Sequence, residues 1–304
     1  MDFLLRHPAG VVSLHPRKSM SASSGGDAVT KTPLRVSGVG TRKPSTPGLK
    51  WRRSRAFRHG LTSFLVIIVA WEIIGRFVLT NHVFAVPFSS VVEAAFKMWD
   101  SGELQTDIIA SFTAVAYGML LAIIFGVLLG VILGASTIIR EYVEPVVTAL
   151  YATPLVAIAP LLILWFGIGI ASKIAVVFLM AVFPIAINTS SGILNTDPEF
   201  IEVARGFRAN RAQIIGKVMV PAAIPFVVTG IRLAVGRAIV GVVVGEMFGA
   251  RAGLGFLIFT AGQTFDTSSL FVGVITLSLI GMGLTLAIRA IEDRLSAWKP
   301  RAAE

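Results

Sequence analysis

The stretch TDPEFIEVARGFRANRAQIIGKVMVP, residues 196–221, is a polar island between two apolar segments. It opens with residues that are typical of a helix start. Thr196 with Glu199 fits a capping box, whereas Asp197 before Pro198 fits an N-cap followed by proline at the first helical position. The two patterns start the helix one residue apart, and the sequence leaves both open.

The island continues as a short helix with one apolar face. Four apolar residues repeat at i, i+3, i+4 and i+7, and they are Phe200, Val203, Ala204 and Phe207. Glu199, Glu202 and Arg205 lie off this stripe. The segment is too short and too charged to span a bilayer. The pattern predicts a helix that lays its apolar face into a groove of another protein. The alternative is a helix resting on the inner leaflet, which the basic residues suit and the two glutamates disfavour.

The composition of the whole chain indicates a membrane protein. Of its 304 residues 55% are hydrophobic and 14% charged, with a mean hydropathy of +0.80, which is too apolar for a soluble domain of this length. The net charge of +10 does not indicate nucleic-acid binding, because 12 of the 27 Lys and Arg precede residue 60 and most others flank apolar segments. The chain has no cysteine, so disulfides and thiolate chemistry are excluded.

Six apolar segments are long enough to cross a bilayer, and they lie at about 61–79, 108–135, 144–168, 173–194, 218–248 and 270–291. They predict an all-α polytopic membrane protein with six transmembrane helices. The distribution of Lys and Arg places both termini and the polar island in the cytoplasm, and counting four spans from a cytoplasmic N-terminus gives the same side for the island. The loop 80–107 is then external, with a short interfacial helix at 91–99.

The predicted domains follow from these spans. They are a basic cytoplasmic segment at 1–58, a first transmembrane helix with its outer loop at 59–106, the main transmembrane domain at 107–292 and a cytoplasmic tail at 293–304. The composition of residues 1–50 favours disorder. A transit peptide or secretory signal is the alternative, although no apolar h-region precedes residue 60. A start at Met20 is a further interpretation.

Several residues inside the spans have chemical or packing consequences. Glu72 and Arg76 are spaced i, i+4 and predict an ion pair at the interface. Gly126, Gly130 and Gly134 recur every fourth residue, which favours close approach of a neighbouring helix.

The pathway candidates are prolines and polar residues at membrane depth. Prolines interrupt helices in lipid only beside protein or a water-filled cavity, and ionisable groups in a span face the bundle interior or water. The predicted pathway residues are Pro154, Pro160, Asn188, Arg232 and Glu246. Pro145 is a third proline of the same segment. Arg237 lies five residues after Arg232 and therefore on another helix face. Either arginine suits an anionic substrate, but helix packing accounts for the presence of both equally well.

Catalytic and cofactor motifs are absent from the sequence. There is no P-loop, no GxSxG and no plausible metal ligand set, and the four histidines lie outside the predicted spans. We therefore expect no enzyme activity, no metal and no cofactor in this chain.

The polar island resembles the EAA loop of ABC-importer permeases, which runs Glu-Ala-Ala, three residues, Gly, nine residues, then Ile-x-Leu-Pro. Here Glu202-Val-Ala204 starts the motif and Val218-Met-Val-Pro221 ends it at the same spacing. Residues 160–174, 230–236 with Glu246, and 253–258 are similar to the nitrate/sulfonate/taurine branch, and the resemblance covers about 80–295.

The sequence departs from the family pattern at three places. Arg208 stands where the family's loop has glycine, and a left-handed backbone there would strain it unless Gly206 or Asn210 takes the turn. Ser111-Phe-Thr-Ala114 and Pro87-Phe-Ser89 also differ from the common family motifs.

The resemblance implies a type I ABC importer permease (MetI-like) fold in a bacterial inner membrane. It implies two permease copies, expected as a homodimer in lipid, two cytoplasmic ATPase subunits, and an extracytoplasmic substrate-binding protein. Residues 196–217 would be the ATPase-coupling loop, and its implied contact residues are Phe200, Glu202, Val203, Ala204, Arg205, Gly206, Phe207, Arg208 and Pro221. A stand-alone secondary transporter or channel, or a membrane scaffold, is the alternative function.

Overall fold

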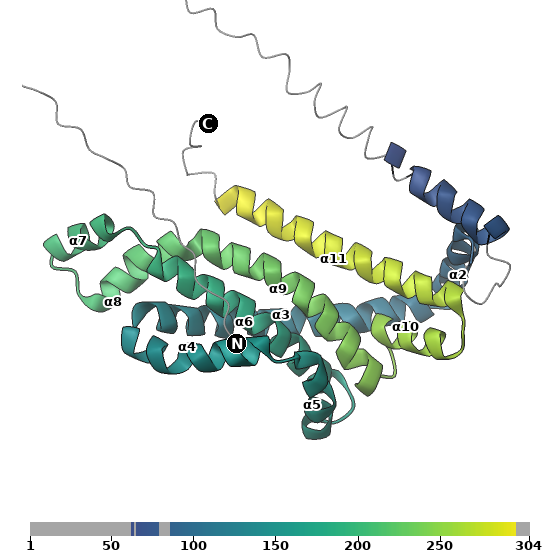
Figure 1. Ribbon diagram of the computed structural model, residues 1–304, viewed down its shortest axis with the longest axis horizontal. Helices are drawn as coiled ribbons and strands as arrows, with labels where there is room; N and C mark the ends of the chain where they lie inside the picture. The colour runs from purple at the N-terminus through teal and green to yellow at the C-terminus, as the bar shows by residue number, and fades with distance from the viewer. Residues whose placement is uncertain (1–61, 64, 79–85, 296–304) are drawn as a thin grey trace, which may run out of the picture. The chain divides into compact units, whose positions relative to one another are not determined.

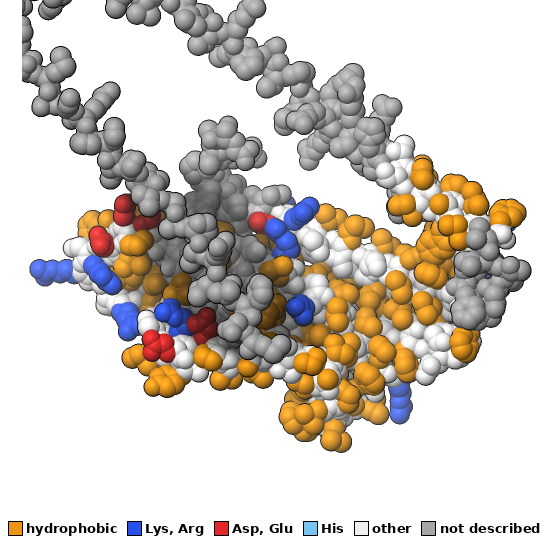
Figure 2. Space-filling model, in the orientation of Figure 1, with side chains coloured by type: hydrophobic (Ala, Val, Ile, Leu, Met, Phe, Trp, Pro, Cys, Tyr) orange, Lys and Arg blue, Asp and Glu red, His pale blue; other side chains and the backbone are white. Residues whose placement is uncertain are grey.

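The computed structural model describes residues 62–63, 65–78 and 86–295, which form helices joined by short loops, with no strand among them (Figure 1). The predictions for 1–58 and for the end of the tail lie outside these ranges. Figure 2 shows charged side chains where α7 (Pro198–Gly206) and α8 (Arg211–Ile214) lie, and mainly apolar side chains over the uncovered surface at the opposite end of that face.

Four described helices are long and apolar enough to cross a membrane. They are α3 (Glu103–Ala135), α6 (Ile170–Leu194), the continuous run 211–249 that ends in α9 (Val220–Gly249), and α11 (Thr267–Leu295). A fifth span is a bent pair, α4 (Thr137–Ala152) and α5 (Ala159–Phe166), joined by the 3-10 turn η2 (Leu155–Ile158).

The predicted first span, 61–79, is described only in part. Residues 62–63 and 65–73 are α-helical and continue as the π-helix η1 (Ile74–Val78). The all-α polytopic fold is confirmed, with four spans among the described residues, or five if the bent pair is one span, and a sixth span at 61–79 stays a prediction.

The core forms where α3, α6 and α9 pack together. In the most apolar window of α6, 61% of the residues are buried, against 17% in α11, so α6 is the central helix and α11 a peripheral one. A glycine row on α3 allows the close approach that its spacing predicts. A Cβ on Gly130 would lie 2.5 Å from the Ala186 carbonyl oxygen of α6, which leaves room for no side chain there.

The bent span corrects the predicted segment 144–168. The helix starts earlier, at Thr137, because the Ser136 hydroxyl caps it by accepting from the Ile139 amide. It continues through Pro145 and turns by 85° at residues 153–154. Pro160 lies in the first turn of α5, where the missing amide hydrogen costs no helical hydrogen bond.

Shorter helices also lie between the spans, among them α2 (Phe88–Asp100) and α10 (Leu254–Gln263). The predicted helix at 91–99 is present as α2. The predicted Glu72–Arg76 pair also forms, and its carboxylate accepts from the Ser89 amide at 3.0 Å near the start of α2. The segment expected at 249–269 contains α10 (Leu254–Gln263), which is too short to span a bilayer.

Candidate functional site

The polar island folds as a helix that starts at the second of the two predicted positions. The Asp197 carboxylate accepts from the Glu199 amide at 2.9 Å, and Pro198 is the first residue of α7. Thr196 is buried, and its hydroxyl has no hydrogen-bond partner among the described residues. Asp197 is therefore the N-cap.

The apolar stripe of α7 covers no other part of the described chain. Phe200 is 61% exposed, Val203 59% and Phe207 84%, and Ala204 is half-buried. No residue of α7 is fully buried. Large apolar side chains at such exposure on a polar segment are typical of a surface that binds another molecule.

The chain leaves α7 through a left-handed residue. Arg208 has φ +56°, whereas Gly206 stays helical and Asn210 is extended and caps α8. The Arg208 amide donates to the Arg205 carbonyl at 2.8 Å and the Ala209 amide to the Ala204 carbonyl at 3.0 Å. These two bonds form a Schellman motif, in which the left-handed position is usually glycine. Position 208 is thus the turn, and it is occupied by arginine.

The loop connects without a break to a membrane span. After the Asn210–Gln213 capping box, α8 passes into the π-helix η3 (Ile215–Met219) and then into α9, with Pro221 in its first turn. Because the run 211–249 is one continuous helix, a displacement of α8 has to move α9.

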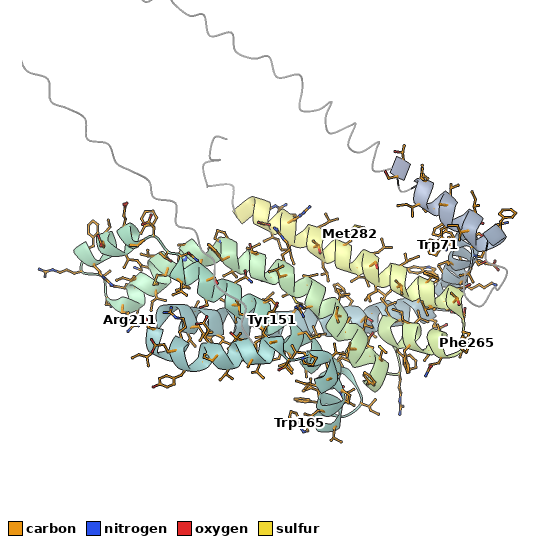
Figure 3. The ribbon with its side chains drawn as sticks, viewed as in Figure 1. Trp71, Tyr151, Trp165, Arg211, Phe265 and Met282 are labelled. Atoms are coloured by element: carbon orange, nitrogen blue, oxygen red, sulfur yellow. The ribbon has the colours of Figure 1, made fainter. Side chains whose placement is uncertain are left out.

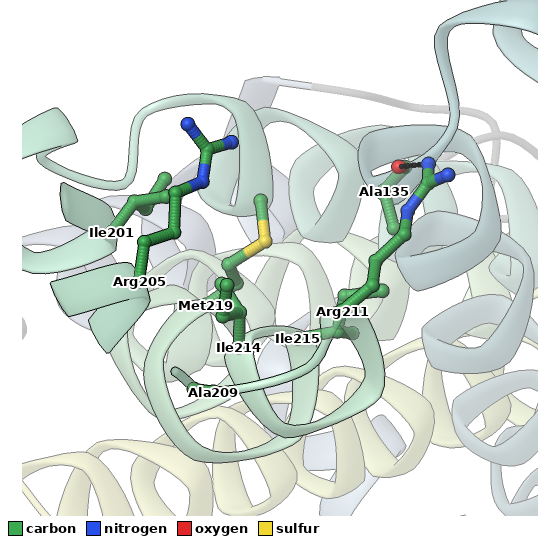
Figure 4. A pocket seen from close by; sticks show the side chains of 8 residues that line it. All are labelled: Ala135, Ile201, Arg205, Ala209, Arg211, Ile214, Ile215 and Met219. Carbon is green, nitrogen blue, oxygen red and sulfur yellow. Dashed lines mark hydrogen bonds between the residues drawn. The ribbon is translucent and has the colours of Figure 1, made fainter. Parts of the chain in front are cut away.

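A pocket lined by two arginines and six apolar residues lies beside α7. Its volume is about 480 Å³, and Figure 4 shows its lining, Ala135, Ile201, Arg205, Ala209, Arg211, Ile214, Ile215 and Met219. The Arg211 guanidinium donates to the Ala135 carbonyl at 2.8 Å, which joins the island to the end of α3. Glu202 and Arg205 are both exposed.

The predicted pathway residues lie outside the polar island, at the bend after α4 and on α5, α6 and α9. Pro154 is exposed at the bend of α4 and Pro160 is exposed on α5. The Asn188 amide donates to the Pro184 carbonyl of its own helix at 2.8 Å. Arg232 forms an ion pair with Glu292 of α11. A role in the pathway stays a prediction for all of them.

Glu246 is fully buried and binds groups from three parts of the chain. Its carboxylate accepts from the Ser111 hydroxyl at 2.9 Å, from the Gly255 amide at 2.8 Å and from the Lys173 ammonium at 3.5 Å. Lys173 also donates to the Ala252 carbonyl at 2.9 Å. In this conformation the carboxylate holds the loop before α10 against α3 and α6.

Two further bonds hold the same loop. The Gly253 amide donates to Asp107 at 2.7 Å, and the Leu254 amide donates to the Ser111 hydroxyl at 2.8 Å. Sequence reasoning missed these partners because they come from helices far apart in the chain. We call the four side chains the α10 socket, and they are Asp107, Ser111, Lys173 and Glu246.

Within the described ranges, no group of three or more histidine, aspartate or glutamate side chains is placed to hold a metal ion.

Comparison with known proteins gives one consistent result. Residues 122–297 match the family described as "Binding-protein-dependent transport system inner membrane component". Among curated relatives, the putative aliphatic sulfonates transport permease protein SsuC of Bacillus subtilis is 36% identical over 82% of this chain and 90% of its own. The taurine transport system permease protein TauC of Escherichia coli is 29% identical over 82% and 94%. The riboflavin transport system permease protein RibX of Chloroflexus aurantiacus is 37% identical over 78% and 88%.

A solved structure shares the fold. The inward-facing MetNI methionine ABC transporter superposes with a TM-score of 0.58 at 20% identity, over 65% of this chain and 97% of that one. This likeness confirms the MetI-like arrangement of helices predicted for the chain.

Proposed function

We propose a function for this chain from its family, since it belongs to the binding-protein-dependent transport system inner membrane components. It is a membrane-embedded permease subunit of an ABC importer and not an enzyme. Two of its relatives are named for the transport of aliphatic sulfonates and of taurine, and a third for that of riboflavin. We propose that it forms the translocation pathway for a small solute of that kind.

The polar island is proposed as the coupling site for a separate ATPase. The observation that carries this proposal is the uncovered stripe of α7, in which Phe200, Val203 and Phe207 are all exposed. A helix that presents such residues fits a groove, with Glu202 and Arg205 forming polar contacts at its rim. The sequence contains no P-loop, so the ATPase would be another chain.

The continuous helix 211–249 supports a mechanical role for the loop. When ATP draws two ATPase subunits together, each docked α7 would be displaced, and α8 would pass that displacement to α9. The packed α3–α6–α9 core would then rotate as a rigid body, alternately opening a central pathway to the two sides of the membrane.

The assembly proposed is that of a type I importer. Two copies of this chain enclose the pathway, two ATPase subunits bind in the cytoplasm, and an extracytoplasmic protein delivers the solute. The proposed location is a bacterial inner membrane, crossed several times, with both termini in the cytoplasm.

The test replaces an exposed residue of the stripe. Phe207→Ser should leave the membrane-inserted chain folded, because the 84% exposed side chain makes little contact within it. It should reduce co-purification with the ATPase and ATP-driven uptake of taurine or ethanesulfonate at least tenfold. Glu202→Lys should likewise abolish uptake and ATPase stimulation.

The matched control is Phe96→Ser, which removes a phenylalanine of α2 that is 66% exposed. It should retain ATPase binding. Normal uptake by both loop variants would refute the coupling assignment. Uptake driven by an ion gradient without any ATPase would support the stand-alone transporter instead.

A further inference from the structure

Arg237 lies near the middle of a membrane span. It precedes Gly249, the last residue of α9, by twelve residues, which corresponds to about 18 Å along the helix in a hydrocarbon layer of about 30 Å. The side chain that it contacts, Tyr151, lies between Arg211 and Phe265 along the described helices (Figure 3). The guanidinium is therefore at membrane depth rather than at an interface.

Arg237 is exposed and has no carboxylate partner in the described part of the chain. Arg232, by contrast, is paired with Glu292. An unpaired cation facing acyl chains at this depth is strongly unfavourable. The surface around Arg237 must therefore face water or protein in the membrane.

The exposed surface around Arg237 is a continuous face of α9. The exposed residues repeat with helical spacing, and they are Thr229, Leu233, Gly236, Arg237 and Val240. Ala234, Val235 and Ala238 on the other side are buried in the core. No atom lies within 4 Å of the position that a Cβ would take on Gly236, so the backbone beside Arg237 is open.

Tyr151 brings a second element to the same place. The Arg237 guanidinium lies 5.3 Å from the centre of the Tyr151 ring, and one of its nitrogens is 3.4 Å from the hydroxyl oxygen. Tyr151 is in the last turn of α4, just before the 85° bend, where Thr153 and Pro154 are exposed. A broken backbone at membrane depth also needs water or protein beside it.

We propose that Arg237 and Tyr151 form an anion-binding site on the wall of the translocation pathway. The guanidinium presents a planar fork of N–H donors that suits a carboxylate or sulfonate, and the phenol can donate one further hydrogen bond. The Tyr151 ring holds the guanidinium beside the bend. The site guides the anionic group of the solute past the middle of the membrane. This inference rests on the proposed function and adds the residues that recognise the charge of the solute.

The inference can be tested by labelling a single introduced cysteine, because the chain has no cysteine of its own. Leu233→Cys places a thiol one turn from Arg237 on the same exposed face. Its thiolate can attack a methanethiosulfonate reagent, which forms a mixed disulfide and releases methanesulfinate. Two reagents are compared in the assembled complex, one with a sulfonatoethyl group and one with a trimethylammonioethyl group.

Arg237 should favour the anionic reagent. Its replacement in Leu233→Cys/Arg237→Gln should lower the ratio of the anionic to the cationic rate about tenfold. Arg237→Lys in the same background should keep most of the ratio, because it retains the charge. Ile124→Cys, on an exposed apolar position of α3, should react slowly with both reagents if it faces lipid.

Two results would overturn the inference. A Leu233→Cys that neither reagent reaches in the complex would mean that protein covers this face. An unchanged rate ratio after loss of Arg237 would mean that no anion is drawn there. Because labelling needs neither ATP nor uptake, failure of the transport proposal would show separately, as an intact complex that labels as expected and moves no solute.

Discussion

Arg208 is the residue whose backbone conformation least suits its side chain. A left-handed conformation costs a residue with a Cβ about 1–2 kcal/mol relative to glycine, and Arg208 has φ +56° at the position where a Schellman motif usually has glycine. The two hydrogen bonds of the motif form nevertheless. The turn is thus set by the loop on either side of it rather than by the residue at its centre.

Arg208→Gly should therefore stabilise the turn by about 1 kcal/mol. Hydrogen exchange of the Arg208 and Ala209 positions, followed by mass spectrometry, should slow about fivefold. Arg208→Ala is the control, since it removes the charge and keeps the left-handed strain, and it should leave exchange near the wild-type rate. Faster exchange in the glycine variant would contradict a strained turn.

Gly253 is the opposite case, a glycine that the structure requires. Its φ is +136°, and a Cβ would lie 2.2 Å from an oxygen of the buried Glu246 carboxylate. Gly253→Ala should lower the unfolding temperature of the detergent-solubilised protein by roughly 5–10 °C. Gly262→Ala in α10, where an added Cβ would lie 3.6 Å from the nearest atom outside that helix, should change it by less than about 2 °C. Equal effects of the two substitutions would refute this explanation.

At the scale of elements, the α10 socket explains how a short helix is held among long ones. α10 is too short to span the membrane, and the loop before it is fixed by side chains from α3, α6 and α9. Buried charges of this kind are stable only when each has its partners. The socket therefore makes the position of α10 depend on the packing of three spans.

Lys173→Met should leave the Glu246 carboxylate buried without its cation, at a cost of about 3–5 kcal/mol. The loop would loosen, and trypsin should cleave after the exposed Arg251 several-fold faster in the solubilised protein. Lys173→Met/Glu246→Gln removes both charges and should recover part of the protection.

The control for this prediction is Lys97→Met, because Lys97 and its partner Glu93 are both largely exposed. Exposed pairs contribute little to stability, so cleavage should stay at the wild-type rate. A double variant that is cleaved as fast as Lys173→Met would show that the charge pair is not what holds the loop.

At the scale of the whole molecule, the proposed orientation puts the polar island and the α10 socket on opposite sides of the membrane. Arg251, in the loop after α9, would then face outward, and Glu199, in α7, would face the cytoplasm; both are exposed. The basic residues around the island favour this direction over its reverse.

Membrane-impermeant maleimide distinguishes the two orientations because the natural chain has no thiol. Arg251→Cys should be labelled on intact spheroplasts, and Glu199→Cys only after the spheroplasts are lysed. Ala238→Cys, at a buried position, should stay unlabelled in intact and in lysed spheroplasts. The reverse pattern for the first two variants would invert the topology and place α7 out of reach of a cytoplasmic ATPase.

Much of the fold follows from periodicity and composition. The long apolar helices, the short helix at 198–206 and the glycine row of α3 depend on local spacing, and each is present in the structure. The boundaries are less predictable, since α3 starts at Glu103 and the bent span at Thr137. The first residue of each helix depends on capping side chains and on neighbouring turns, and a hydropathy pattern contains no information about either.

That this chain is a polytopic membrane protein with an amphipathic island follows from its residues alone, because burial in lipid imposes long apolar runs and a stripe needs only helical spacing. Three features became visible only in the folded chain: which of two caps starts α7, that Arg208 takes the left-handed turn, and which partner each ionisable group contacts. Glu246 joins the α10 socket, Arg232 meets Glu292, and Arg237 stays exposed beside Tyr151. These outcomes depend on contacts between distant segments, and no local pattern records which helices become neighbours.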